Sequence, residues 1–197
     1  TMRSMLVIIA MLLVATIAAT TTTKKARRRG SDDSVNVSEL LRKGQSPQQI
    51  QERSRTSAFP LHRGGNNAAD PFAYSGYINV NKTMDANLFY VFFEAINGNK
   101  KAPIVIWLQG GPGCSSMMGL FYENGPYHIT ESLELTKNPY TWNQEYQLLY
   151  IDNPAGAGFS YVTNSKGYVV NEAEMANELY RFLQTFYKTY PQYIPNE

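Results

Sequence analysis

Hydrophobic and polar residues alternate in distinct ways beyond the first third of the chain, and these patterns predict a β-hairpin and two buried strands. Residues 72–80 and 88–95 are rich in aromatic and β-branched side chains, and the polar run 81–85 predicts a turn that joins them as antiparallel strands. Residues 104–108 and 147–152 have apolar runs without polar alternation, which is typical of strands covered on both faces. We therefore expect 104–108 to be a central parallel strand.

The last long element is predicted to be an amphipathic helix. Asn171 can cap its first turn, Glu174 is placed to complete a capping box, and Pro191 ends it. The apolar residues at helical spacing share one face and are expected in the core; they are Met175, Leu179, Phe182, Leu183, Phe186 and Tyr190. Strands followed by a helix that covers them predict the α/β fold class.

The amino-terminal region has the pattern of a secretory signal peptide. Arg3 precedes an apolar core at 6–14, and small residues at 15–20 offer a cleavage site. The apolar stretch is shorter than the roughly 20 residues that cross a bilayer, so no stable membrane span is expected; an uncleaved anchor is the alternative. The chain is accordingly divided into a signal peptide (1–20), a flexible polar leader (21–71) and a folded domain (72–197).

Composition and charge agree with a folded domain that does not bind nucleic acid. The chain is 43% apolar, which is ample for a core. Its net charge of +2 arises at the amino end, where residues 1–30 hold six of the 18 Lys and Arg and no acidic residue. The remainder therefore carries 12 basic against 16 acidic residues, a net charge of −4. No cluster with metal-ligand spacing is visible, and no cofactor is expected.

Two glycosylation sequons, at Asn36 and Asn81, support passage through the secretory pathway. The second falls at the predicted hairpin turn, where a sugar would stay in solvent. Cys114 is the single cysteine, although an oxidising compartment favours cysteine pairs. Cys114 can also be interpreted as a small buried apolar residue.

A glycine-rich turn follows the strand at 104–108 and is the strongest candidate for chemistry. The segment 107–116 reads Trp-Leu-Gln-Gly-Gly-Pro-Gly-Cys-Ser-Ser. Gly110 and Gly111 can take positive φ and let a ligand approach the backbone, so their N–H groups could bind an anion or a developing oxyanion. The alternative is a tight turn without a function.

Several separated motifs, in order, resemble the serine carboxypeptidase family of α/β-hydrolases from Tyr74 onward. They are residues 107–116, Tyr-Glu-Asn-Gly-Pro at 122–126, Asn-Pro-Tyr-Thr-Trp at 138–142 and Asp-Asn-Pro-Ala-Gly-Ala-Gly-Phe-Ser-Tyr at 152–161. Gln109 precedes the Gly-Gly pair where most of the family has Asn, as in the vitellogenic-like carboxypeptidases. In the family, the cysteine equivalent to Cys114 is usually tied to one far downstream.

The resemblance implies a role for each residue of the turn. Gly111 would contribute its backbone N–H to the oxyanion hole, while Gln109, Gly110 and Glu123 would bind the free C-terminal carboxylate of a peptide. Two carboxyl groups at hydrogen-bonding distance must share a proton, because like charges drive one pKa up. Binding would then weaken as the pH rises, which indicates an acidic setting such as a lysosome or vacuole, or an extracellular one.

The nucleophile elbow of α/β-hydrolases, Gly-x-Ser-x-Gly, does not occur in the 197 residues. Around Ser160, Val162 stands where the second glycine belongs, and the resemblance does not make Ser160 the nucleophile. His62 is interpreted as a loop residue and His128 as part of a strand or turn edge. Ser115 and Ser116 are expected to cap a helix at 117–122. The chain is thus expected to be the amino-terminal part of an α/β-hydrolase sheet, truncated before its elbow, with no complete Ser-Asp-His triad.

Three functions fit these observations. The first is a serine-type carboxypeptidase that acts on peptides or proteins with a free C-terminus. In this case, the present chain is expected to be inactive by itself. The second is a non-catalytic secreted glycoprotein, and the third is a fragment of a serine carboxypeptidase-like acyltransferase. The sequence beyond Glu197 distinguishes the first from the second, since the first requires a following elbow with later Asp and His residues.

Overall fold

The structure, a computed structural model, describes residues 34–56, 58–59 and 73–196. The chain separates into two compact units, residues 1–34 and residues 35–197, and the fold described below is that of the second unit. The signal peptide predicted at 1–20 lies outside the described residues, as does His62.

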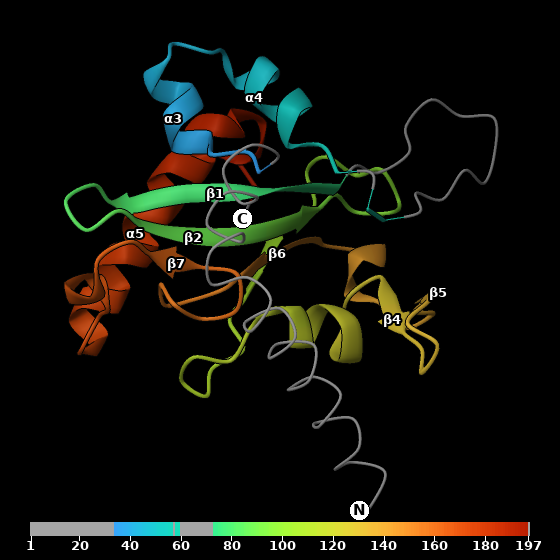
Figure 1. Ribbon diagram of the computed structural model, residues 1–197. Coiled ribbons are helices and arrows are strands. Elements are labelled where there is room, and N and C mark those ends of the chain that lie inside the picture. The colour runs from blue at the N-terminus through green and yellow to red at the C-terminus, as the bar shows by residue number, and fades with distance from the viewer. Residues whose placement is uncertain (1–33, 57, 60–72, 197) are drawn as a thin grey trace, which may run out of the picture. The chain divides into compact units, whose positions relative to one another are not determined.

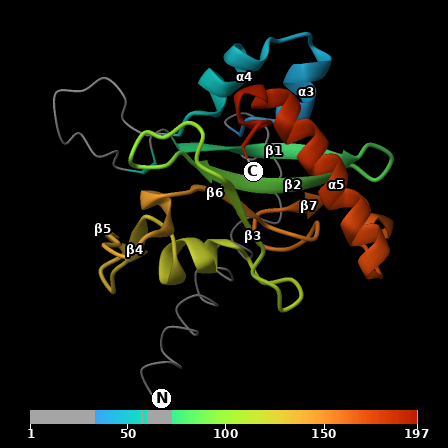
Figure 2. The same cartoon turned by 180° about the vertical axis from the view of Figure 1, so that it is seen from behind.

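The centre of the unit is a mixed β-sheet in the order β1-β2-β6-β3. The edge strand β1 (Ala73–Asn81) pairs antiparallel with β2 (Ala86–Phe93), and β2 pairs antiparallel with β6 (Gln147–Ile151). On its other side, β6 pairs in parallel with β3 (Ile104–Trp107), and the short β7 (Tyr161–Val162) also joins β2. Figure 1 shows β1, β2, β6 and β7, and Figure 2 shows β3 from behind. The predicted hairpin and the predicted strand at 147–152 are confirmed.

The hairpin turn between β1 and β2 is closed by its own polar side chains. Asn81 Oδ1 accepts a hydrogen bond from the amide of Met84 at 3.3 Å. Asp85 has a φ of 48°, a left-handed conformation that Asp tolerates better than most residues. Its Oδ1 accepts from Asn79 Nδ2 at 3.0 Å and from Asn87 Nδ2 at 2.9 Å. The polar run therefore acts as a turn, as its composition predicts.

Two short helices precede β1, and here the structure differs from the flexible leader expected from the sequence. Helix α3 (Val37–Arg42) lies in the short amphipathic stretch, and α4 (Pro47–Ser54) begins at a capping box. In that box, Gln49 N donates to Ser46 Oγ at 3.3 Å, and the Ser46 amide donates to Gln49 Oε1 at 2.9 Å.

The leader prediction is wrong for residues 35–56 because a few apolar side chains anchor the segment. Val37 and Ile50 are fully buried and belong to the same hydrophobic cluster as β1 and β2. Isolated bridges join Asn36 to Tyr77 and Arg55 to Tyr74, so the segment also pairs with β1. Short helices draw their stability from such tertiary packing, which average polarity does not reveal.

The predicted carboxyl-terminal helix is confirmed as α5 (Glu172–Thr189). Asn171 Oδ1 accepts from Glu174 N at 2.9 Å, as the capping prediction requires. Phe182, Phe186 and Tyr190 are fully buried against the sheet. Together α3, α4 and α5 cover one face of the sheet (Figures 1 and 2). No helix within the described ranges is long and apolar enough to cross a membrane.

The opposite face of the sheet is covered by a different set of short elements. They are a π-helical turn, η1 (Gly119–Glu123), and the two-stranded ribbon of β4 (Tyr127–Ile129) and β5 (Leu135–Lys137). A second cluster forms between them and the sheet, with Leu120, Tyr127, Leu148 and Tyr150 in its interior. The predicted helix at 117–122 is thus a π-helical turn.

Strand β3 is an edge strand in the part of the chain that the structure describes, which corrects the prediction of a central strand covered on both faces. All five residues of β6 are buried, whereas every residue of β3 is at least partly exposed. Ile106 is 36% exposed, and Leu108, directly after the strand, is 39% exposed. An apolar run reports hydrophobicity but not whether a neighbouring strand lies alongside, so the two strands looked alike in the sequence.

Candidate functional site

The glycine-rich turn begins directly after β3 and takes a backbone conformation that favours glycine. Gly110 has a φ of 78° and Gly111 a φ of 116°. The amide of Cys114 donates to the carbonyl of Gly110 at 3.1 Å and closes the turn. A Cβ at Gly111 would lie 2.9 Å from Cys114 Sγ, so a side chain there would also collide within the turn.

The backbone amides of this turn are available to a ligand. Gly110, Gly111 and Gly113 are exposed, and none of their N–H groups has an acceptor among the described residues. Unpaired N–H groups on a turn with positive φ form a concave patch of partial positive charge that suits an anion. The turn can therefore bind a carboxylate or an oxyanion.

The side chain of Gln109 is held between a donor and an acceptor. Trp107 Nε1 donates to Gln109 Oε1 at 3.0 Å, and Gln109 Nε2 donates to Glu123 Oε1 at 2.8 Å. Because the indole N–H can only donate, it fixes the amide oxygen on its own side and turns the NH₂ group toward Glu123. The structure thus brings together two of the residues singled out in the sequence.

The π-helical turn η1 delivers Glu123 to this position. Gly119, at its start, lies so close to Trp107 that a Cβ would be 2.2 Å from the indole Nε1. Asn138 fixes the following residues, because its Nδ2 donates to the carbonyl of Gly125 at 2.9 Å. Single π-turns are frequent at functional sites. In the sequence, Trp107 was part of the motif 107–116 without an assigned role, and Gly119 was not singled out.

Ser116 connects the turn to the sheet instead of capping a helix, which corrects the prediction for this residue. Its buried Oγ donates to the carbonyl of Ile151 at 2.6 Å and accepts from the amide of Gln109 at 3.3 Å. Ser115 does act as a cap, since its Oγ accepts from the amide of Met117 at 3.2 Å. The ends of β3 and β6 are therefore joined directly beneath Gln109.

The remaining candidate residues for nucleophilic chemistry have structural partners. Ser160 is buried; its Oγ donates to the carbonyl of Asp152 at 2.6 Å and accepts from the amide of Phe89 at 2.8 Å. His128 lies in β4, with Nδ1 3.0 Å from the carbonyl oxygen of Phe121. No described serine is hydrogen-bonded to a histidine, so these residues do not form a nucleophile and base pair.

Cys114 is exposed, which contradicts its interpretation as a small buried apolar residue. It lies in the glycine-rich turn, whose outer surface faces solvent.

The two sequons lie away from the glycine-rich turn and differ in how their asparagines are bonded. Asn36 caps α3, and its Nδ2 donates to Asn87 Oδ1 at 3.3 Å. Asn81 lies at the hairpin, next to the exposed Lys82 and Thr83, and its Oδ1 alone takes part in the turn. The Asn81 amide nitrogen is therefore the freer of the two.

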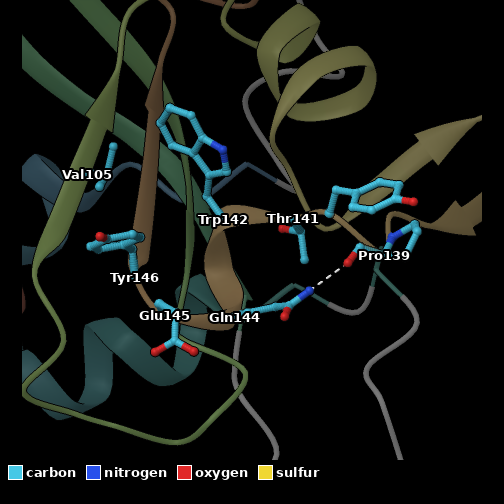
Figure 3. A pocket seen from close by; sticks show the side chains of 8 residues that line it. Val105, Pro139, Thr141, Trp142, Gln144, Glu145 and Tyr146 are labelled. Atoms are coloured by element: carbon cyan, nitrogen blue, oxygen red, sulfur yellow. Dashed lines mark hydrogen bonds between the residues drawn. The ribbon is translucent and has the colours of Figure 1, made fainter.

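An apolar hollow of about 760 Å³ lies beside the same edge of the sheet. Figure 3 shows Val105 of β3 facing Trp142 and Tyr146, with Gln144 donating to the carbonyl of Pro139 at 2.7 Å. Trp142 packs edge-on against Trp107 at a centroid distance of 5.8 Å, so the hollow adjoins the indole that orients Gln109. Its lining is mostly aromatic and aliphatic, which suits an apolar surface and not a carboxylate.

Metal chemistry has no candidate ligands in the described ranges. No group of three or more His, Cys, Asp or Glu side chains there could hold a metal ion. The free amides of the turn and the Gln109–Glu123 pair are the features beside β3 that suit an anionic ligand.

Comparisons with known proteins identify the family that the chain resembles. A family model described as serine carboxypeptidase matches residues 65–197. The chain is 50% identical over 127 residues to serine carboxypeptidase S10 family member 1 of Dictyostelium discoideum, covering 64% of this chain and 30% of that protein. It is 47% identical over 136 residues to a serine carboxypeptidase-like protein of Oryza sativa, covering 68% of this chain and 32% of that protein.

The fold matches a solved structure as well. The crystal structure of a prohormone-processing carboxypeptidase from Saccharomyces cerevisiae aligns with a TM-score of 0.52 and 31% identity, covering 61% of this chain and 28% of that one. The predicted α/β class, as part of an α/β-hydrolase domain, is thereby confirmed. The chain spans about a third or less of the length of the proteins it matches.

Proposed function

The chain belongs to the serine carboxypeptidase family, and from that membership we propose that it supplies the carboxylate-binding and oxyanion-binding parts of a serine-type carboxypeptidase. The substrate is a peptide or protein with a free C-terminus. The observation that carries the proposal is the Gln109–Glu123 hydrogen bond of 2.8 Å beside a turn with free amides.

The Gln109–Glu123 pair recognises the terminal carboxylate of the substrate. The indole of Trp107 occupies the amide oxygen of Gln109, which leaves the NH₂ group to face the ligand and Glu123. A carboxylate bound there accepts from Gln109 Nε2 and from the amide of Gly110. Charge-assisted hydrogen bonds of this kind discriminate a free acid from an amide.

A proton must lie between Glu123 and the bound carboxylate. Two ionised carboxylates at hydrogen-bonding distance repel each other, so one of them holds a proton in the complex. Affinity for free-acid peptides therefore falls as the pH rises. This supports a protein that works in an acidic compartment.

The amide of Gly111 stabilises the tetrahedral oxyanion of the reaction. It lies two residues beyond Gln109, on the exposed side of a turn that is anchored to two strands. The 197 residues hold no Gly-x-Ser-x-Gly elbow, so acyl-enzyme chemistry requires a nucleophile and base that these residues do not provide. By themselves they are inactive.

The chain enters the secretory pathway. The charged and apolar pattern of residues 1–20 supports a cleaved signal peptide, and the sequons support glycosylation in the lumen. Asn81 is the preferred acceptor, because its neighbours are exposed and Asn36 is engaged with Asn87. Delivery to a lysosome-like compartment or to the outside follows.

The test uses a complete enzyme, defined as a protein in which this segment is part of a complete serine carboxypeptidase domain. The Dictyostelium relative with its matching 127-residue segment replaced by that of this chain serves as such an enzyme. Hydrolysis of a blocked dipeptide with a free C-terminus is compared with that of the same dipeptide amidated. The unaltered enzyme should act on the free acid at pH 5.

The decisive variant is Glu123→Ala. It should lower kcat/KM for the free-acid dipeptide about tenfold or more, while the amidated dipeptide is affected much less. Glu131→Ala, an exposed glutamate outside the site, is the matched control and should change neither value. Equal losses on both substrates would contradict carboxylate recognition by Glu123. No release of the C-terminal residue by the unaltered enzyme would contradict the function itself.

A further inference from the structure

The buried carboxylate of Asp152 lies outside the Gln109–Glu123 pair and is hydrogen-bonded to two separate segments. Asp152 follows β6 and is fully buried. Its Oδ1 accepts from Ser115 Oγ and from the Ser116 amide, both at 2.8 Å, and its Oδ2 accepts from the amide of Phe159 at 2.8 Å. One side chain thus joins the glycine-rich turn to the loop at 152–160.

The loop approaches Asp152 so closely that only glycine fits at position 158. A Cβ at Gly158 would lie 2.1 Å from Asp152 Oδ2 and 2.7 Å from Ser115 Oγ. The φ of Gly158 is 51°, a left-handed conformation that glycine adopts without the strain a side chain would cause. Glycine at this position lets the loop close over the carboxylate, and the closed loop excludes water from it.

Two of the three donors to Asp152 lie immediately after the amides proposed to bind substrate. Ser115 and Ser116 come directly after the turn that Cys114 closes, and the Ser116 hydroxyl accepts from the amide of Gln109. A shift of these two serines would move both ends of the turn. Three donors that converge on one carboxylate give a more rigid anchor than a neutral side chain could, because charge-assisted hydrogen bonds are shorter and stronger.

We infer that Asp152 is a positioning residue that holds the glycine-rich turn in the orientation at which the Gly111 amide faces the oxyanion. The inference rests on the proposed carboxypeptidase function. Asp152 touches neither substrate nor the reacting atoms; it acts through Ser115 and Ser116. Its effect should therefore fall on every substrate that forms the oxyanion, whatever its C-terminal group.

The test is Asp152→Asn in the complete enzyme, with kcat expressed per active site titrated by a serine-directed phosphonate. Asn replaces one acceptor oxygen with a donor, so at least one of the three N–H or O–H groups loses its partner. The value of kcat should fall about tenfold to a hundredfold, since misplaced oxyanion donors cost rates of this order. The free-acid and amidated dipeptides should lose the same factor, unlike the selective loss in Glu123→Ala.

Two further variants guard against a folding defect. Ser115→Ala removes one of the three hydrogen bonds and should give a smaller fall of about twofold to fivefold. Asp85→Asn is the matched control, because Asp85 also accepts two side-chain hydrogen bonds but lies in the hairpin turn. It should leave kcat per site unchanged.

Hydrogen exchange provides a readout that does not depend on activity. In Asp152→Asn, the amides of the peptide covering residues 108–118 should exchange about tenfold faster, while those of α5 should not change. An unchanged kcat per site, or a loss confined to the free acid, would overturn the inference. If the unaltered enzyme releases no C-terminal residue, the proposed function fails, and unchanged exchange at 108–118 would then overturn the inference separately.

Discussion

The face of the sheet covered by α5 (the α5 side) and the edge formed by β3 (the β3 side) are built differently. The first supplies stability, and the second supplies ligand recognition. Under α5, aromatic rings close on one another: Phe186 packs edge-on against Phe92 at 5.2 Å and lies 4.7 Å from Tyr190. Beside β3, apolar side chains such as Ile106 remain partly exposed, and backbone amides remain unpaired.

The two regions also differ in what fixes their geometry. The α5 side depends on non-directional burial, which tolerates small shifts of its side chains. The β3 side depends on directional hydrogen bonds, which Trp107 and Ser116 donate and Asp152 accepts. A binding site needs the second kind of order, because a ligand is sensitive to displacements of less than an ångström.

The largest expected effect concerns peptide hydrolysis, because the β3 side supplies binding groups but no nucleophile. Purified residues 1–197 should release a C-terminal amino acid from a blocked dipeptide at less than about 10⁻⁴ of the rate of the complete enzyme, since losing the nucleophile costs a factor of this order or more. Activity at pH 5 that is inhibited by a serine-directed phosphonate would contradict this prediction.

The next effect tests the α5 side as the source of stability. Phe186→Ala in the complete enzyme should cost about 3–5 kcal/mol, because it opens a cavity among closely packed rings. The expected fall in Tm is about 3–6 °C, because the complete domain has roughly 400 residues. Tyr180→Ala, on the exposed face of the same helix, is the control and should change Tm little. Similar losses in both variants would show that helix propensity and not burial governs this region.

A smaller effect tests the open edge of β3. Residues 1–197 alone should associate or be partly unfolded, because an exposed apolar strand edge pairs with other chains. Ile106→Lys should reduce aggregation. The protein concentration at which half of the protein aggregates should rise about threefold or more. Tyr180→Lys is the matched control. A monodisperse monomer with a sharp cooperative melt would argue against the prediction.

The smallest effect concerns pH and the buried carboxyl of Glu178 on α5. Burial raises the pKa of Glu178 above its ordinary value, and one of its oxygens has no hydrogen-bond partner within the described ranges. The folded state therefore holds this proton more tightly than the unfolded state, so the contribution to stability is greatest at low pH. It is lost as the pH rises from the ordinary value to the raised one.

Glu178→Gln removes this titration. It should raise Tm at pH 7 by about 1–2 °C and leave Tm near pH 4 unchanged. Glu131→Gln, on the surface, is the control for the lost charge. A lower Tm at pH 7 in Glu178→Gln would mean that the ionised carboxylate stabilises α5.

The sequence predicted those parts of the fold in which local pattern and tertiary contact agree. The hairpin, β6 and α5 were found because their turn residues, apolar runs and caps all indicate the same element. The helices α3 and α4 were not, since a few buried apolar residues such as Val37 and Ile50 anchor them, and β3 was predicted to be covered because its composition resembles that of β6.

The site was predicted in its residues but not in its support. Gly110 and Gly111 were predicted from the glycine-rich turn itself, Gln109 and Glu123 came from the resemblance, and the structure adds the contact between Gln109 and Glu123. The supporting residues Trp107 and Asp152 act across a strand end and between loops. The hydrogen bonds of Asp152 join segments distant in sequence, and that of Trp107 spans two residues at the start of an irregular turn, so neither leaves a periodic pattern.

The most direct measurement is a crystal structure of the complete enzyme at pH 5 with a product peptide bound. The proposed function predicts that the terminal carboxylate of the peptide lies within hydrogen-bonding distance of Gln109 Nε2, Glu123 and the amide of Gly110, with the indole of Trp107 still on Gln109 Oε1. A terminal carboxylate bound elsewhere, with Gln109 and Glu123 still bonded only to each other, would contradict the account.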